Sequence, residues 1–391
     1  MEPSELLSSF DQYDPAHVQV MHEVLAHARR ECPVFHTTAE PGYWVVSRYA
    51  DAKRILFDTA AFSNRNGVTV HGVGEPRPLP AAADPPLHKQ YRDILRPYFT
   101  QQAIRAHEPE LRKLAQQLME PWLSTGEVEF VKDYAAKLAY AALFAVFLRS
   151  SGAEDIDLFV AGADRIVQES TQDAYAQLMG LVRQLLARRR SSGVEINDMI
   201  GAVELGSVDG RPLTEDEKVG MIFSAVAAGF ETNYATMALI MHQVVRHPEL
   251  ETRIQGPDWA SGHLAEFLRF VSPVTGLIRT VTRDTEIGGV ALRAGDTVLV
   301  HYASVDRDEA QFPQADTLDF ARPNSGQHMA FSFGVHRCLG APFAEFLIGI
   351  GLEELTRRAT GFRLRDPELD VPYTTGVVCR PEALPLTFEL R

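Results

Sequence analysis

The 391-residue sequence predicts a mainly α protein with a small β region, an α+β fold. Apolar residues recur with the 3.6-residue period of amphipathic helices over most of the chain. Short strand-like runs occur in two places, at Tyr43–Val46 and between residues 285 and 300. Because no internal repeat or flexible linker divides the sequence, we expect residues 1–391 to form one domain whose strands are segregated from its helices.

The first part of the chain combines helices with one long loop. Helical periodicity predicts helices over 17–31 and 50–57, with the strand Tyr43–Val46 between them. Residues 72–86 contain five prolines together with glycines and alanines. Such a composition predicts an irregular segment, and loops of this length are usually functional or mobile.

The middle of the chain is expected to be almost entirely helical. The predicted helices cover residues 88–96, 101–124, 131–149, 154–170 and 172–190. A polar stretch with a turn at Asp209-Gly210 follows, and then a long helix from Glu215 to His247 that Pro248 ends.

The last third begins with a helix over 259–271, closed by Pro273. The period then changes, and residues 285–292 are typical of a hairpin with a Gly-Gly turn, followed by a strand over 297–300. A loop-rich stretch over 306–337 precedes a final amphipathic helix over 339–358.

Composition excludes several classes of function. With 38 Lys+Arg against 52 Asp+Glu, the net charge is −14, which argues against general binding to a phosphate backbone. The three cysteines have no CxxC spacing, which argues against a disulfide framework or a zinc site and favours a reducing compartment. Residues 1–15 lack a signal sequence, and no apolar stretch is long enough to span a membrane. We therefore expect a cytoplasmic protein without a membrane anchor.

The most informative segment is residues 331–340, FSFGVHRCLG. Cys338 lies between two glycines and directly before a helix, where free N–H groups and the helix dipole favour a thiolate. Such a thiolate could bind a soft or borderline metal. A buried structural cysteine is the alternative, and these residues alone do not decide between the two.

Taken together, Phe331, Gly334, His336, Cys338 and Gly340 match every fixed position of the heme-binding loop of the cytochrome P450 family, which this segment resembles. The resemblance implies the cytochrome P450 fold and a heme b (iron protoporphyrin IX) whose iron is bound by the Cys338 thiolate. Phe331 and Gly340 would belong to the same cofactor-binding loop. A departure is Ser332, where many bacterial members have glycine.

Other segments resemble the family in the same order along the chain. Glu266 and Arg269 match its Glu-x-x-Arg motif, and the resemblance makes them a buried structural pair joined by Arg322. Taken alone, such an i,i+3 pair is usually a surface salt bridge.

The segment 84–92, DPPLHKQYR, also resembles a bacterial pattern of the family. Its His88 and Arg92 are four residues apart and share a helix face, so they could clamp a carboxylate or simply form an exposed pair. The resemblance assigns both to the heme propionates, together with Arg279 and His336.

The run 227–232, AAGFET, places a glycine, an acid and an alcohol within the long helix. Taken alone, Thr232 would hydrogen-bond its own preceding turn while Glu231 faces water. The family resemblance instead implies a local widening of the helix that makes an oxygen pocket. There Thr232 would hydrogen-bond oxygen and Glu231 would relay protons. Asn233 stands where many members have Thr or Ser.

The resemblance implies a monooxygenase that uses O2 as co-substrate and oxidises an apolar or amphiphilic small molecule. No dinucleotide-binding or P-loop fingerprint is present, so we expect no bound flavin or nicotinamide. Electrons are expected from a separate ferredoxin with its reductase, docked on a basic face around the cysteine, and we expect a monomer. The residues of that face would be Lys89, Arg92, Arg96 and Arg337.

Three alternatives stay open at this point: a peroxide-driven peroxygenase, a pathway-specific oxidase that desaturates or couples its substrate, and a heme sensor without turnover. The intact Glu231-Thr232 pair argues against the peroxygenase. The resemblance implies that the substrate pocket would be lined from 64–82, 160–185, Ala225, Gly229, Thr275, Gly276 and Val377-Val378. Small residues at several of these places predict a roomy site.

Overall fold

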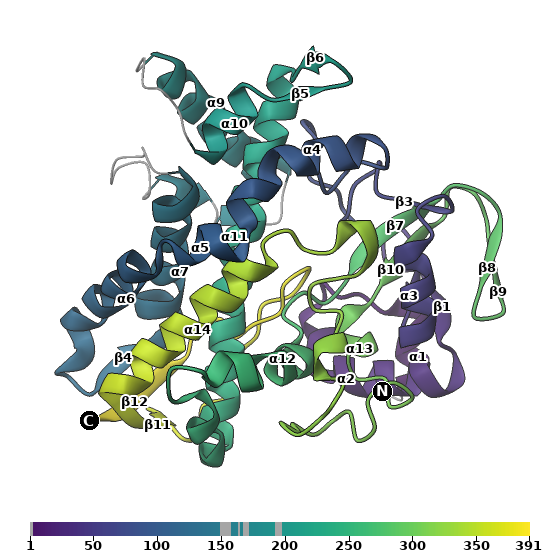
Figure 1. Cartoon of the computed structure of the whole chain (residues 1–391). Helices are drawn as coiled ribbons and strands as arrows, with labels where there is room; N and C mark the ends of the chain where they lie inside the picture. Colours follow the sequence, from purple (N-terminus) through teal and green to yellow (C-terminus); the bar gives the residue numbers. More distant parts are fainter. Residues whose placement is uncertain (1–2, 149–157, 163–164, 167–171, 192–197) are drawn as a thin grey trace.

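The computed structural model describes residues 3–148, 158–162, 165–166, 172–191 and 198–391 (Figure 1). Long helices make up one side and most of the centre, while strands and loops gather on the other side. The α-helices are α1 (Pro3–Leu6), α2 (Pro15–Glu31), α3 (Tyr49–Phe57), α4 (Leu87–Leu95), α5 (Gln101–Arg105), α6 (Glu108–Leu123), α7 (Ala136–Leu143), α9 (Gln172–Ser191), α10 (Met199–Glu204), α11 (Glu215–Arg246), α12 (Trp259–Val271), α13 (Tyr302–Val305) and α14 (Ala341–Arg358). The mainly α fold with a small β region is therefore confirmed.

Strands that are far apart in sequence form the sheets. The strands are β1 (Val34–Thr37), β2 (Tyr43–Val46), β3 (Phe62–Ser63), β4 (Glu127–Glu129), β5 (Ser207–Val208), β6 (Arg211–Pro212), β7 (Leu277–Val281), β8 (Thr285–Ile287), β9 (Val290–Leu292), β10 (Thr297–Val300), β11 (Ala359–Leu364) and β12 (Pro385–Leu390). A five-stranded sheet has the order β1-β2-β10-β7-β3, and a three-stranded sheet has the order β11-β12-β4. The pairs β5-β6 and β8-β9 are separate hairpins.

Features encoded by a few adjacent residues agree with the sequence predictions. The β8-β9 hairpin turns at Gly288 and Gly289, with φ of 56° and 83°. Both values lie in the left-handed region that glycine adopts without strain, as a type I′ turn requires. Asp209-Gly210 makes the equivalent turn between β5 and β6. Long helix α11 begins at a capping box made by Thr214 and Glu217, which satisfies its first free N–H groups.

Several predicted elements differ from the structure. The single helix expected over 101–124 is two helices, α5 and α6, because the chain breaks at 106–107 and restarts with Pro109 in the first turn of α6. The helix expected over 131–149 has α-helical geometry only in α7, with wider π-helical turns over Phe130–Ala135 and Phe144–Leu148. Most of the helix expected over 154–170 lies outside the described residues.

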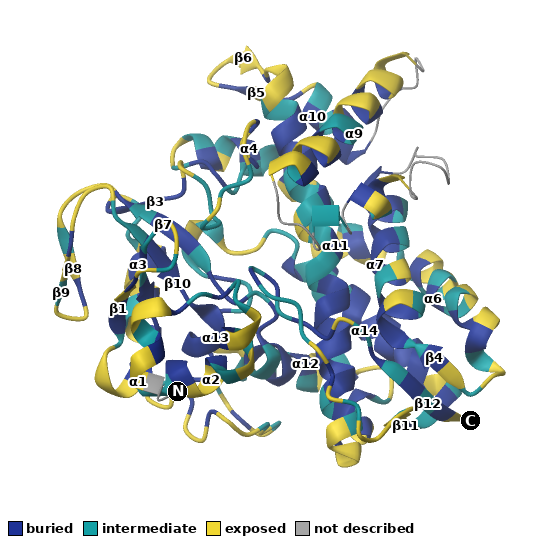
Figure 2. Cartoon of the chain, turned by 180° about the vertical axis from the view of Figure 1, so that it is seen from behind, coloured by how far each residue is buried: buried dark blue, intermediate teal, exposed yellow. Residues whose placement is uncertain are grey.

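Helix α11 runs through the core and carries the run AAGFET. It packs against α7, α9, α12 and α14, and its C-terminal half is largely buried while its N-terminal half is more exposed (Figure 2). A Cβ on Gly229 would come within 2.5 Å of the Leu143 side chain, so glycine allows α11 and α7 to approach closely at this point. No helix in the described part of the chain is both long and apolar enough to cross a membrane.

The Glu-x-x-Arg pair on α12 is buried, as the resemblance implies, and is not the surface salt bridge that the spacing alone would suggest. Arg269 donates to both carboxylate oxygens of Glu266, at 2.9 and 2.7 Å, and Arg322 donates to the same carboxylate at 3.2 Å. Arg269 is fully buried, and its other N–H groups donate to the carbonyls of Asp306, Ala315 and Thr317. This network fixes the loop at 306–322 to α12.

Candidate active site

The loop before α14 holds Cys338 through its own backbone. The N–H of Cys338 donates to the carbonyl of Phe331 at 2.8 Å, and the N–H of Ser332 donates to that of Met329 at 2.7 Å. Gly334 has a φ of 70°, and a Cβ there would lie 2.4 Å from the Leu56 carbonyl oxygen. Only glycine fits this close approach to the end of α3, which explains the fixed glycine of the loop.

The Cys338 sulfur faces the first amides of α14. Its side chain is exposed, yet enough protein surrounds it that desolvation raises the pKa of the thiol, while the N–H groups of Gly340 and Ala341 and the charges of Arg92 and Arg337 act to lower it. The position of Cys338 directly before a helix predicts that the thiolate is favoured. In the protein alone, desolvation outweighs these amides, and a bound cation would supply the remaining stabilisation of the thiolate.

Four basic side chains lie around one place near this cysteine. The rings of His88 and His336 are 4.2 Å apart between centroids. Desolvation, with the charge of Arg92, lowers the pKa of His88 to about 4. Desolvation, with the charges of Arg279, His88 and Arg92, lowers the pKa of His336 to about 3. These mutual effects show that the four residues assigned by resemblance to one function are close together.

The donor set suits the two carboxylates of a heme. Arg279 is only 3% exposed, and its Nη1 donates to the neighbouring carbonyl of Ile278 at 2.7 Å. Among the described residues, no acid forms an ion pair with Arg279 or with Arg92. A buried guanidinium without an anionic partner is costly, and two propionates would supply the missing charge and accept bidentate hydrogen bonds. The cluster therefore fits the cofactor that the sequence implies.

The run AAGFET adopts a regular helix. Helix α11 continues without interruption through Thr232, so the implied local widening does not appear. Instead, the Thr232 hydroxyl donates to the Ala228 carbonyl at 2.8 Å, and the Asn233 side-chain amide donates to the Gly229 carbonyl at 2.6 Å. Ala228 is exposed although it is in the middle of α11, so this helix face is open beside Thr232.

Glu231 has a partner that sequence reasoning missed. Its carboxylate accepts a hydrogen bond from Nε of Arg380 at 3.3 Å, and both side chains are mostly buried, with 20% and 8% of their surfaces exposed. The two residues are 149 positions apart. No local pattern could have paired them, because only the packing of the last hairpin, residues 373–381 closed by a bridge between Tyr373 and Pro381, against α11 brings them together.

The residues predicted to line the substrate pocket are only partly as expected. Thr275 is buried and its hydroxyl interacts with Gln12 and with the carbonyls of Gly376 and Val377. A Cβ on Gly276 would lie 2.7 Å from the Val300 carbonyl. Gly229 and Gly276 are therefore small because neighbouring groups pack against them, and the inference of a roomy site from these two residues is wrong. Part of 160–185 lies outside the described residues.

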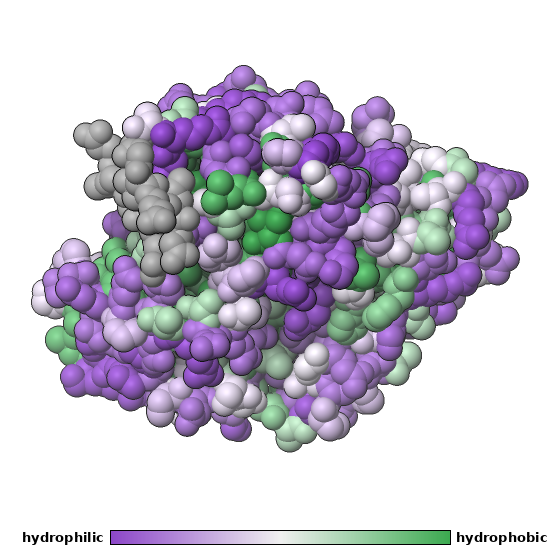
Figure 3. Space-filling view, turned by 45° about the horizontal axis from the view of Figure 1, so that its top comes forward, coloured by the Kyte–Doolittle hydropathy of each residue, from purple (hydrophilic) through white to green (hydrophobic). Residues whose placement is uncertain are grey.

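The molecule nevertheless has hollow apolar surface. Figure 3 shows apolar side chains in a hollow surrounded by hydrophilic residues, on the face that carries α4, α9 and α10. A cavity of about 2050 Å³ lies elsewhere along α11, lined by residues of its C-terminal half, of α2, of α7 and of the segment 369–382.

Comparisons with known proteins identify the family. A family model described as "Cytochrome P450" matches residues 261–383. The chain is 30% identical to "Probable cytochrome P450 127A1" of Sinorhizobium fredii, over 88% of this chain and 84% of the relative. It is 29% identical to "Mycinamicin IV hydroxylase/epoxidase" of Micromonospora griseorubida, over 88% of this chain and 89% of the relative. The structure of cytochrome P450 CYP109Q5 from Chondromyces apiculatus superposes with a TM-score of 0.85 and 26% identity, over 98% of this chain and 99% of that one.

The fold and the relatives define a heme-thiolate oxidoreductase. The chain belongs to the cytochrome P450 family, and its enzyme class is that of the monooxygenases of this family. The family implies heme and O2 as cofactor and co-substrate.

Proposed function

We propose that this chain forms a single heme domain that inserts one oxygen atom from O2 into a lipophilic or amphiphilic small molecule, with Cys338 as the metal ligand. The observation that carries the proposal is the meeting of Cys338 with Arg92, Arg279, His88 and His336, a thiol and four basic groups in one place. A thiolate and two carboxylate clamps are what a heme requires from a protein.

Each residue of the cluster has a role that follows from its chemistry. Arg279 and Arg92 bind the propionates through charge-assisted hydrogen bonds, and His88 and His336 donate from their ring nitrogens. Phe331 and Gly340 hold the loop, since the Phe331 carbonyl accepts from the Cys338 N–H and the Gly340 N–H faces the Cys338 sulfur. The bound heme supplies O2 activation, which thiolate donation favours.

Thr232 and Glu231 are proposed to control the delivery of protons. The Thr232 hydroxyl, which donates to the Ala228 carbonyl, can rotate to donate to oxygen, because a hydroxyl hydrogen is free to turn. Glu231 is the acid next to it, and it would supply the proton that the hydroxyl passes on. This pair favours reduction of O2 with proton delivery over the use of preformed peroxide.

The electrons are proposed to come from a separate ferredoxin with its reductase. Arg337 is exposed next to Cys338 and forms no ion pair with any described residue. Lys89 and Arg96 are exposed too, but both contact Asp93, which reduces the local positive charge. We therefore assign to Arg337 the largest share of the electrostatic attraction for the ferredoxin. Reduction of the heme should slow as the salt concentration rises, because exposed charges are screened within about 8 Å at physiological ionic strength.

The substrate class rests on the apolar hollow and on the relatives. One relative is named for hydroxylation and epoxidation of mycinamicin IV, and a small apolar or amphiphilic molecule is what the hollow in Figure 3 would accept. We propose a cytoplasmic monomer that binds neither nucleic acid nor a membrane.

The proposal is tested with purified heme-loaded protein, a surrogate ferredoxin and its reductase. Lipophilic compounds are first screened for the low-spin to high-spin shift of the heme spectrum, and those that bind are then turned over under ¹⁸O2. The expected product gains one labelled oxygen atom. Product formed only with added peroxide would indicate the peroxygenase, loss of two hydrogens the oxidase, and binding without consumption of reduced nicotinamide the sensor.

A further inference from the structure

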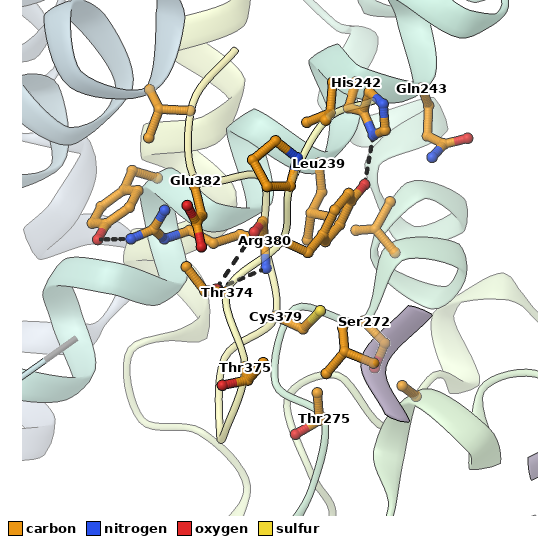
Figure 4. A pocket seen from close by; sticks show the side chains of 18 of the residues that line it. Leu239, His242, Gln243, Ser272, Thr275, Thr374, Thr375, Cys379, Arg380 and Glu382 are labelled. Atoms are coloured by element: carbon orange, nitrogen blue, oxygen red, sulfur yellow. Dashed lines mark hydrogen bonds between the residues drawn. The ribbon is translucent and has the colours of Figure 1, made fainter. Parts of the chain in front are cut away.

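Arg380 contacts helix α11 and also lines the large cavity beside it. The cavity is lined by Tyr234, Leu239 and His242 of α11 and by Thr374, Cys379 and Arg380 of the last hairpin (Figure 4). Nε of Arg380 donates to Glu231, and Nη2 donates to the hydroxyl of Tyr234 at 3.1 Å. The guanidinium also lies over the Tyr234 ring, 4.8 Å from its centroid. Arg380 therefore connects the acid of α11 with the cavity wall.

The backbone on either side keeps Arg380 in this position. Its N–H donates to the Thr374 hydroxyl at 3.2 Å, and its carbonyl accepts from the Thr374 N–H at 2.8 Å. Its Nη1 donates to the carbonyl of Pro381 at 2.9 Å. With all three guanidinium nitrogens hydrogen-bonded and 7% of the residue exposed, Arg380 is a fixed charge and not a mobile surface side chain.

A mostly buried ion pair of this kind is a weak source of stability, because desolvation of two charges offsets most of their attraction. Its position is more informative, since Glu231 directly precedes Thr232 in a helix whose face is open there. On the basis of the proposed function, we propose that Arg380 is a positioning residue, which holds the carboxylate of Glu231 in place. It orients the carboxylate and connects it to the cavity, which is the source of the protons that the reaction consumes.

The proton balance of the overall reaction defines what Glu231 has to do. One turnover joins one O2, two electrons and two protons with the substrate, and yields the oxygenated product and water. For each proton, a hydronium ion that enters the cavity from solvent protonates the Glu231 carboxylate as the contact between Glu231 and Arg380 opens, and a water molecule remains. Glu231 then releases the proton towards the Thr232 hydroxyl, and the carboxylate returns to Arg380. No bond other than those to hydrogen is made or broken at either residue.

The energetic coupling between Glu231 and Arg380 can be measured without an activity assay. Thermal unfolding midpoints are compared for wild type, Glu231→Gln, Arg380→Met and the double variant. We expect the double variant to lose less than the sum of the two single losses, as interacting residues do. Additive losses would overturn the pairing. Arg246→Met is the matched control, because Arg246 lines the same cavity on α11 but is exposed.

Turnover then separates positioning from a merely structural link. Arg380→Met should slow substrate-saturated turnover about tenfold, equivalent to about 1.4 kcal/mol, with substrate affinity unchanged and a larger solvent isotope effect. Arg380→Lys should recover most of the rate, and Arg380→Met should have no further effect in Glu231→Gln. Unchanged turnover in Arg380→Met would overturn the role of Arg380. So would a double variant that is slower than Glu231→Gln by the full factor that Arg380→Met shows in the wild-type background. A wild type without any turnover would instead refute the proposed function, while the unfolding data still decide the pairing.

Discussion

The hydroxyl of Tyr302 donates to Oγ of Ser332 at 3.1 Å. Ser332 occupies the loop position at which the sequence departs from the family pattern, and its φ is 56°. The left-handed conformation explains why glycine is frequent there, since a side chain costs about 1–2 kcal/mol in this region. The Tyr302 hydrogen bond offsets part of that cost, so this chain keeps the loop geometry with a residue other than glycine.

This pair gives a prediction about stability. In wild type, Ser332→Gly relieves backbone strain but leaves the buried Tyr302 hydroxyl without its acceptor, which costs about 1–3 kcal/mol, so the net effect should be small or destabilising. In the Tyr302→Phe background, the same change should raise the free energy of unfolding by about 1 kcal/mol. Denaturant unfolding of the four proteins measures both effects. Equal effects of Ser332→Gly in the two backgrounds would show that the hydrogen bond does not stabilise the loop.

A second prediction concerns the buried network around Glu266. Glu266→Gln leaves Arg269 and Arg322 buried without their carboxylate, and breaking a buried pair in this way costs about 3–5 kcal/mol. Thermal unfolding and heme content should both fall. The control is Asp133→Asn, which removes an exposed pair with Lys137 and should cost less than about 1 kcal/mol. If Glu266→Gln were as mild as its control, the network would not hold the fold.

A third prediction follows from His242, which is buried and whose Nδ1 lies 2.5 Å from the Tyr373 hydroxyl. Desolvation, with the charge of Arg246, lowers its pKa from 6.5 to about 4. The unfolded chain therefore binds more protons than the folded one between these pH values, and stability falls as pH falls from 6.5 to 4. His242→Gln should remove at most about 3 kcal/mol of that pH dependence, at 1.36 kcal/mol per pH unit. Parallel pH profiles for the two proteins would contradict the expectation.

The fourth prediction concerns Thr232. Thr232→Ala should still bind substrate and accept electrons, but it removes a donor whose hydrogen bond to a charged group is worth about 1.5–3 kcal/mol. Product formation should slow roughly ten- to a hundredfold relative to peroxide release. The measurement is the ratio of product to reduced nicotinamide consumed. Thr236→Ala is the matched control, because Thr236 makes the same bond to the preceding turn one turn later, at 2.7 Å to the Thr232 carbonyl. If Thr232→Ala formed as much product per reduced nicotinamide as wild type, Thr232 would have no role in the reaction beyond its place in the helix.

The sequence predicts those parts of the fold that depend on a few adjacent residues. The turn at Gly288-Gly289, the cap at Thr214 and the glycine-bounded cysteine loop all follow from local conformational preferences. Strand β4 could not be predicted in this way, since its three residues Glu127–Glu129 are too short for an alternating pattern and pair with 385–387, far along the chain. Strand β12 does alternate apolar and polar residues over 386–390, a local signal that the sequence prediction missed, and it pairs with both β11 and β4.

The site shows the same limit. The family resemblance predicts the cluster of Cys338, His88, Arg92, Arg279 and His336, and the structure brings these residues together. The contact of Arg380 with Glu231 was not predicted, because an ion pair between distant residues leaves no local signal. The small residues of the predicted pocket were misinterpreted for a related reason. A glycine that makes room for a ligand and one that makes room for the protein look alike until the neighbours of the residue are known.

The central claim is that Cys338 binds the heme iron as a thiolate. The most direct measurement is the absorption spectrum of the reduced protein with carbon monoxide. The wild-type complex should show the strongly red-shifted Soret band of a thiolate-ligated heme. Cys338→His should lose this band, and Cys379→Ser should keep it. A wild-type band like that of a histidine-ligated globin, or one that persists in Cys338→His, would contradict the account.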